Sequence, residues 1–170
     1  MTLTDGLQVR QRPRLAAVVW MLVGLVGVVA LMWFSRSPTE LPVSEETVSV
    51  STPVGQPVYV GVFAPPGDFG RTLHLSGVKV HTTANTEVTV VPLLCRGGTI
   101  GVTTQPETFC SELLDPEGQR FGAGDEIVLK ITSADPAIAV IERVRLGYRE
   151  GIQSATQEAG AETIVRVLGR

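Results

Sequence analysis

The sequence is poor in charge, in aromatic side chains and in the residue types that bind metals. Charged residues make up 18% and aromatic residues 5% of its 170 positions, whereas about a quarter of a typical soluble protein is charged. It has two cysteines and two histidines, with no Cys-X-X-Cys pair and no second Cys/His pair at zinc-ligand spacing. We therefore expect no metal site, no redox-active thiol pair and no cofactor.

Basic surface and catalytic motifs are missing as well. The formal net charge is −3, and a nucleic-acid-binding protein needs a basic face, so no nucleic-acid partner is expected. No Gly-X-Ser-X-Gly or Ser-X-X-Lys motif is present. The segment from Asp115 to Glu126 has the length of a calcium-binding loop, but Arg120 stands where such loops require glycine. We expect two β-turns there, with Asp125 or Glu126 in solvent, and no enzyme active site.

One long apolar run is present, at Leu15–Phe34, and it contains no charged residue, Asn, Gln or Pro. As a helix rising about 1.5 Å per residue, it matches the roughly 30 Å hydrocarbon layer of a bilayer. A cleaved signal peptide has a shorter apolar core, of about 7–15 residues, and a small-X-small cleavage site. This run instead ends in the bulky Met32, Trp33 and Phe34. The sequence therefore predicts an uncleaved helix that contacts the lipid bilayer through Leu15–Phe34.

Charged residues on the two sides of the run predict its orientation. Arg10, Arg12 and Arg14 precede it and Arg36 follows it, and the side richer in Lys and Arg stays in the cytoplasm. The residues after the run carry a net charge of −5, so we expect the exported domain to stand off anionic lipid. The predicted layout is a cytoplasmic tail at 1–14, a signal-anchor helix at 15–34, an extracytoplasmic stalk at 35–57 with an optional first strand at Val48–Ser51, and an extracytoplasmic β domain at 58–170.

The exported part has the patterning of an all-β domain. Short apolar or alternating segments are separated by turns rich in Gly, Pro, Asp and Ser, which favours an antiparallel β-sandwich, immunoglobulin-like, or a small barrel. We expect a bulge at Gly77, because the apolar phase shifts by one residue there. Only Ser154–Ala161 is expected to form a helical turn. The expected strands are Val58–Phe63, Leu73–Val80, Glu87–Cys95 in a central position, Ile127–Thr132 half-buried, Ile138–Tyr148 and Thr163–Leu168.

Cys95 and Cys110 both lie in the part predicted to be outside the cytoplasm, where disulfides persist. The residues between them are rich in Gly, Thr and Pro and contain little else to hold a loop in place. We predict a Cys95–Cys110 disulfide, which would add about 3 kcal/mol of stability in the chain-entropy account. An immunoglobulin core bridge would enclose a much longer stretch that includes a Trp, so this disulfide is expected to close a loop.

Two groups of residues are candidate binding elements. The first is the start of the disulfide-closed segment, with Arg96, Gly97, Gly98 and Thr99 as a binding loop. The second is a row of arginines on one strand face, Arg143, Arg145 and Arg149, which suits an acidic partner or an anionic polymer. Such a row is more often a solvated face paired with acids on the neighbouring strand.

The strong preference for Arg over Lys, with abundant Ala, Val and Gly, and the absence of an Asn-X-Ser/Thr acceptor are typical of a bacterial protein. The sequence therefore predicts a single-pass protein of the cell membrane whose exported β domain is an interaction or accessory module for an unidentified envelope protein. Binding of a cell-wall polymer or a small ligand is the alternative, and hydrolysis ranks last.

Overall fold

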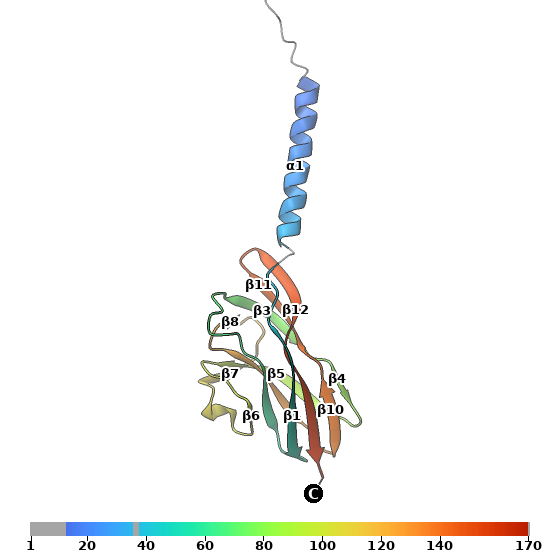
Figure 1. Ribbon diagram of the computed structural model, residues 1–170, viewed down its shortest axis with the longest axis vertical. Coiled ribbons are helices and arrows are strands. Elements are labelled where there is room, and N and C mark those ends of the chain that lie inside the picture. The colour runs from blue at the N-terminus through green and yellow to red at the C-terminus, as the bar shows by residue number, and fades with distance from the viewer. Residues whose placement is uncertain (1–12, 36–37, 170) are drawn as a thin grey trace, which may run out of the picture.

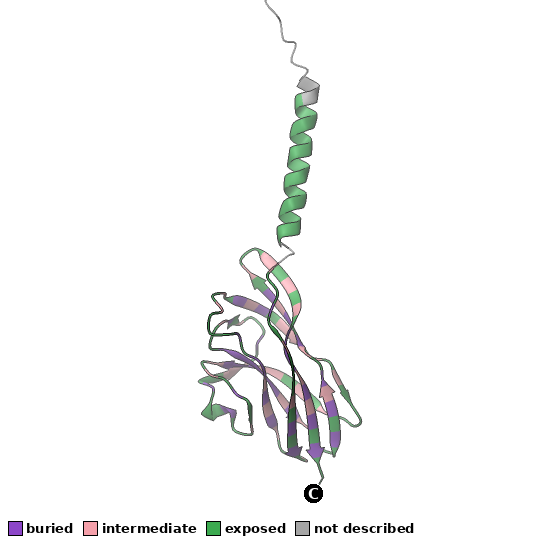
Figure 2. Cartoon of the chain, viewed as in Figure 1, coloured by how far each residue is buried: buried purple, intermediate pink, exposed green. Residues whose placement is uncertain are grey.

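A computed structural model describes residues 13–35 and 38–169, as one long helix followed by two β-sheets (Figure 1). Helix α1, Pro13–Ser35, contains the span Ala16–Phe34, which is long and apolar enough to cross a membrane. Its described side chains are exposed along its whole length (Figure 2), unlike those of an apolar helix in a globular core. The tail at 1–12, with Arg10 and Arg12, lies outside the described residues, as does Arg36.

The strands form two sheets that pack face to face. The β12 sheet has the order β4, β10, β12, β11, β3, β8, and β1 also pairs with β12. The β9 sheet has the order β6, β2, β9, β5, β7. The β12 sheet comprises β1 (Val43–Pro53), β3 (Leu73–Lys79), β4 (Thr82–Ala84), β8 (Arg120–Phe121), β10 (Ala137–Ile141), β11 (Val144–Glu150) and β12 (Gln153–Leu168). The β9 sheet comprises β2 (Val58–Phe63), β5 (Thr89–Arg96), β6 (Val102–Thr103), β7 (Glu112–Leu114) and β9 (Glu126–Thr132).

The antiparallel β-sandwich preceded by one N-terminal apolar helix is confirmed. The barrel alternative is wrong, because the described strands form two open sheets and no closed barrel. The sandwich core is made by alternate residues of the facing strands, among them Leu75 of β3, Leu129 of β9 and Leu146 of β11, which are almost fully buried. The predicted bulge is present, since Gly77 has a positive φ and the pairing of β3 with β11 shifts register beside it.

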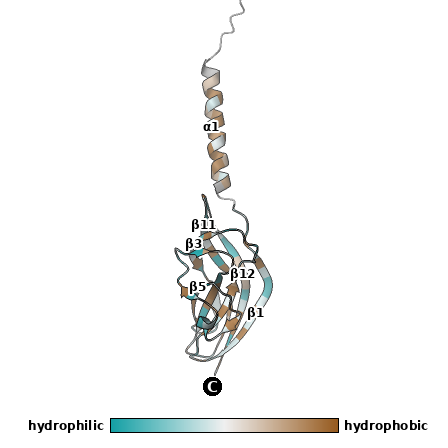
Figure 3. Cartoon of the chain, turned by 90° about the vertical axis from the view of Figure 1, so that its left-hand side faces the viewer, coloured by the Kyte–Doolittle hydropathy of each residue, from teal (hydrophilic) through white to brown (hydrophobic). Residues whose placement is uncertain are grey.

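Strand β1 occupies much of the segment expected as a stalk at 35–57. It pairs with the C-terminal half of β12 in parallel, from Thr47 opposite Glu162 to Pro53 opposite Leu168. Only one side of β1 faces the core, through Val50 and Thr52. The remaining Ser, Thr and Glu positions face water (Figure 3), which is why this edge strand has the composition of a linker.

The residues just before β1 are also attached to the sandwich. Leu41 is 5% exposed and belongs to the core. Its backbone N–H donates to the Gln157 side-chain oxygen of β12 at 2.9 Å, and the Gly160 N–H donates to the Pro42 carbonyl oxygen at 3.1 Å. Chain that is packed and hydrogen-bonded in this way does not act as a flexible stalk.

Three strand predictions need correction. The predicted strand Ile138–Tyr148 is two strands, β10 and β11, separated at Glu142 and Arg143. The predicted helical turn at Ser154–Ala161 lies within β12, where it pairs with β11. The strand Ile127–Thr132, predicted to be half-buried, belongs to β9, which is buried on both faces along most of its length and lies at the centre of its sheet. The strand predicted to be central, β5, has a neighbour on each side, β9 and β7. The outer face of β9 is buried because Ile100 and the two cysteines pack against Val128 there.

Candidate functional site

The outer face of the β9 sheet is covered around Val128 by residues 96–109, called here the disulfide loop. Cys95 lies near the end of β5, and Cys110 follows the short 3₁₀ helix Pro106–Thr108. The two cysteines lie at disulfide-bonding distance, with Cα atoms 5.2 Å apart, which confirms the predicted pairing. Together with Ile100 and Val128 of β9 they form a second, smaller buried cluster. The bridge therefore closes a loop over one sheet and does not join the two sheets.

A buried aspartate fixes the first residues of the disulfide loop. Asp125, 9% exposed, accepts hydrogen bonds from the backbone N–H groups of Gly97 at 3.4 Å and Gly122 at 3.2 Å. Arg96 pairs with the same carboxylate at 3.6 Å and donates to the Arg120 carbonyl oxygen at 3.1 Å. The Asp125 side chain thereby joins the start of the disulfide loop, at Gly97, to the turn that begins at Gly122.

A second buried acid holds the middle of the loop. The Glu126 carboxylate accepts a hydrogen bond from the Ile100 N–H, and the residue is 6% exposed. Burial raises the pKa of Glu126 to about 7, and the hydrogen bond from Ile100 opposes that shift. Gly61 of β2 makes room for this arrangement, because a Cβ atom there would collide with the Ile100 carbonyl oxygen and the Glu126 carboxylate.

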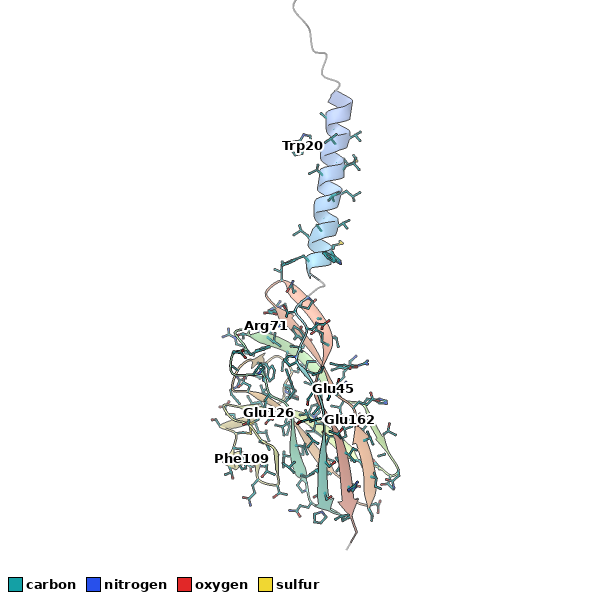
Figure 4. The ribbon with its side chains drawn as sticks, in the orientation of Figure 1. Trp20, Glu45, Arg71, Phe109, Glu126 and Glu162 are labelled. Carbon is teal, nitrogen blue, oxygen red and sulfur yellow. A yellow bond between two sulfur atoms is a disulfide. The ribbon has the colours of Figure 1, made fainter. Side chains whose placement is uncertain are left out.

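Above this support the loop presents apolar side chains to solvent. Phe109 is 51% and Val102 47% exposed, and polar exposed residues such as Gln105 and Glu107 lie between them in the chain. A Cβ atom at Gly98 would collide with the Phe109 carbonyl oxygen, so close backbone packing sets the position of Phe109. In Figure 4 Phe109 lies at the outer margin of the molecule and Glu126 lies further in.

Most of the predicted binding-loop residues make internal contacts that hold the disulfide loop in place, and they do not form its outward surface. Arg96, Gly97 and Gly98 make the internal contacts just described, and of the four only Thr99 and Gly97 are classed as exposed. The outward surface of the loop lies further along the chain, around Val102 and Phe109.

The three arginines predicted to share a face make different contacts in the structure. Arg143 lies between β10 and β11 and donates to the Ser44 carbonyl oxygen of β1 at 3.1 Å and 3.2 Å. Arg145 pairs with Glu158 of β12 at 2.9 Å, as expected for a solvated row with acids on the neighbouring strand. Arg149 is exposed near the end of β11. Arg145 and Arg149 lie on the same, outward side of β11, whose residues alternate between buried and exposed, whereas Arg143 is held by its contact with β1.

The roles of Asp125 and Glu126 were missed from the sequence, where one of them was expected in solvent. The strand that begins at Glu126 contains a pattern from which the burial of Glu126 could have been inferred. Glu126 and Val128 lie on the same face of β9, because side chains alternate between faces. An apolar Val128 on the outer face indicates that something covers that face, so Glu126 is covered too.

The described residues contain no group of three or more His, Cys, Asp or Glu side chains placed to hold a metal ion. The Glu126 carboxyl is buried beneath the disulfide loop, so its arrangement suits holding that loop rather than reacting with a substrate. No protein-family model matches the chain, and a search of curated proteins finds no significant match. The functional assignment therefore depends on the chain's own geometry.

Proposed function

We propose that this chain is a single-pass membrane protein whose β-sandwich is a protein-interaction module outside the cytoplasm. The module contacts an envelope protein through the outward surface of the disulfide loop. The observation that carries this proposal is the contrast between the two sides of the loop. Its inner side is fixed by a disulfide and two buried carboxylates, while its outer side exposes Phe109 and Val102.

The anchor half of the proposal is supported by α1. Its apolar span of 19 residues matches the thickness of a bilayer, and it ends in Trp33 and Phe34, aromatic residues of the kind enriched at membrane boundaries. These bulky residues do not fit a signal-peptidase site. The disulfide is consistent with an oxidising compartment for the sandwich, with the N-terminus in the cytoplasm.

The recognition half is supported by the energetics of preorganised loops. A rigid loop loses little conformational entropy on binding, so its exposed aromatic side chain contributes more to affinity. Aromatic residues surrounded by polar ones are typical centres of protein interfaces. The alternative of anionic-polymer binding is less favoured, because Arg143 is bound to the backbone of β1 and Arg145 is already paired with Glu158 on the surface.

Site-specific photo-crosslinking in cells tests the proposal. A photoreactive phenylalanine analogue at position 109 is expected to crosslink one reproducible envelope protein, identified by mass spectrometry. The same analogue at Ile138, which is 57% exposed on β10, is the matched control and should not give that product. Equal products from both positions, or none from 109, would contradict a docking role for the loop. Capture of cell-wall polymer from position 109 would establish the alternative.

A further inference from the structure

The turn between β11 and β12 has an unusual residue at its tip. Gly151 and Ile152 form a two-residue hairpin turn, with Gly151 at φ +58°, and glycine is the usual first residue of one such turn type. The second residue is normally polar or small, yet here it is an isoleucine with 72% of its surface exposed. Exposure of this apolar side chain to water is unfavourable in free energy.

The same turn lies against the end of the apolar helix. The Gln153 side-chain amide, one residue after Ile152, donates to the Phe34 carbonyl oxygen at 2.9 Å. Phe34 is the last residue of the span that is apolar enough to cross a membrane. Figure 1 shows the β11–β12 hairpin pointing toward that end of α1. Wherever Phe34 marks the boundary of the hydrocarbon layer, Ile152 is therefore at a similar depth.

The chain next to the helix is tied to the base of this hairpin. The Thr39 carbonyl oxygen accepts hydrogen bonds from the Arg71 guanidinium at 3.2 Å and from the Tyr148 hydroxyl at 3.4 Å. Arg71 also donates to both carboxylate oxygens of Glu150, the residue before the turn, with its closest contact at 2.6 Å. The base of the hairpin is thus hydrogen-bonded to Thr39, a few residues after the end of the helix.

The charges beside the turn fit a phospholipid surface. Glu150 is neutralised by Arg71, whereas Arg149 is exposed. Within residues 149–153 the guanidinium of Arg149 is therefore the unneutralised charge, although the exported part as a whole is acidic. A long cationic side chain beside an apolar one is the pattern of groups that sit at the headgroup layer.

We propose that the Gly151–Ile152 turn is a membrane contact, in which Ile152 enters the interfacial layer of the bilayer and Arg149 lies beside lipid phosphates. This inference rests on the membrane anchorage proposed above. It replaces a domain that stands off the bilayer on a stalk with one that is seated on the bilayer surface. The disulfide loop would then be presented at a set distance and angle from the membrane.

A fluorescent probe on a single added cysteine tests this contact in the full chain. Among the described residues no cysteine is free, so Ile152→Cys supplies the thiol that an environment-sensitive dye labels. Ile138→Cys is the matched control, because Ile138 is a similarly exposed isoleucine at the other end of the sandwich. Both proteins are reconstituted into vesicles of phosphatidylcholine and phosphatidylglycerol, and vesicle flotation checks that the chain is anchored.

The expected result is a blue-shifted, severalfold brighter emission at position 152 that is quenched by a nitroxide on the lipid acyl chain. The probe at 138 should instead be quenched by aqueous iodide. A probe at 152 that behaves like the one at 138 in floated vesicles overturns the membrane contact and leaves the anchor intact. A probe shielded from both quenchers lies against protein and also overturns it. Failure of the chain to float overturns the anchorage and the contact together.

Discussion

The disulfide loop and the β11–β12 turn both expose apolar side chains, but they are held in place by different means. The loop lies on a small cluster of four buried residues, and a covalent bridge and two buried carboxylates fix it. The turn is the end of a regular hairpin, held by strand pairing and by the contacts of Arg71. Where a segment has few core residues to pack against, a disulfide and buried acids provide the stabilisation that a larger core would otherwise give.

Among the changes that test this comparison, loss of the disulfide should lower the free energy of unfolding most. The Cys95→Ala/Cys110→Ala variant is expected to lose about 3 kcal/mol of unfolding free energy, because the 15-residue separation sets the chain-entropy term. Denaturant unfolding of the full chain in detergent measures the loss. An unchanged midpoint would mean that the hydrogen bonds of Asp125 and Glu126 suffice to hold the loop.

Glu126 should make stability depend on pH. Its pKa is about 7 in the folded chain, against an ordinary value of 4.5 for an exposed glutamate, so the folded state retains a proton that the unfolded state releases. Stability contributed by this group is therefore present below about pH 4.5 and falls as pH rises to about 7, by up to about 3 kcal/mol.

Thermal melts across that pH range check this dependence. Glu126→Gln resembles the protonated acid, so it should flatten the pH dependence and be more stable than the wild type at pH 8. Glu107→Gln, an exposed acid of the same loop, is the control for charge removal and should leave the slope unchanged. A Glu126→Gln variant that keeps the wild-type slope would assign the titration to another group.

Gly61→Ala tests how tightly the support of the loop is packed. The added methyl group meets the Ile100 carbonyl oxygen and the Glu126 carboxylate, and overpacking of this kind costs about 2 kcal/mol. Gly101→Ala, in the disulfide loop above Gly61, is the control, because an added Cβ there meets nothing within 4 Å. Denaturant midpoints compare the two variants, and equal values would show that the loop can lift off the sheet without cost.

On the hairpin side of the comparison, Glu150→Gln removes the ion pair with Arg71. Both side chains are partly exposed, at 27% and 19%, so solvent screening limits the loss to about 1 kcal/mol. Chemical denaturation at low and high salt measures it, and the difference from wild type should shrink as salt is added. A loss as large as that of the disulfide variant would remove the contrast between the two regions.

Phe109→Ser and Ile152→Ser should change stability least, by less than about 0.5 kcal/mol each, because both side chains are largely in solvent. Their effects are expected to differ in kind: Phe109→Ser lowers the amount of envelope partner that co-purifies with the anchored chain, while Ile152→Ser weakens contact with lipid. Melting temperatures in detergent check the first expectation. A marked fall for either variant would indicate that the side chain packs within the fold.

Local patterns explain what was predictable from the sequence. The helix, the disulfide and the Gly77 bulge follow from an unbroken apolar run, two cysteines and a one-residue phase shift. Strand β1 was difficult to recognise because it is a partly exposed edge strand with polar residues at most positions. Its pairing with β12, more than a hundred residues away, is decided by tertiary packing.

The support of the disulfide loop could not be predicted for a similar reason. Asp125 and Glu126 follow a turn, and Asp and Glu side chains are mostly exposed in folded proteins. Their burial depends on a loop from another part of the chain folding back across β9. Neither periodicity nor composition contains that information. The contact of Arg143 with β1, 99 residues away in the sequence, could not be predicted for the same reason.

The parallel pairing of β1 with β12 determines how the domain responds to force. β1 continues from the end of the sandwich nearest α1, and β12 ends close to the C-terminus at the opposite end (Figure 1). Pulling the C-terminus away from the helix slides the two strands past each other, and the hydrogen bonds from Thr47 to Pro53 share the load. The first and last strands thus form a shear joint, which resists tension far better than a hairpin opened one bond at a time.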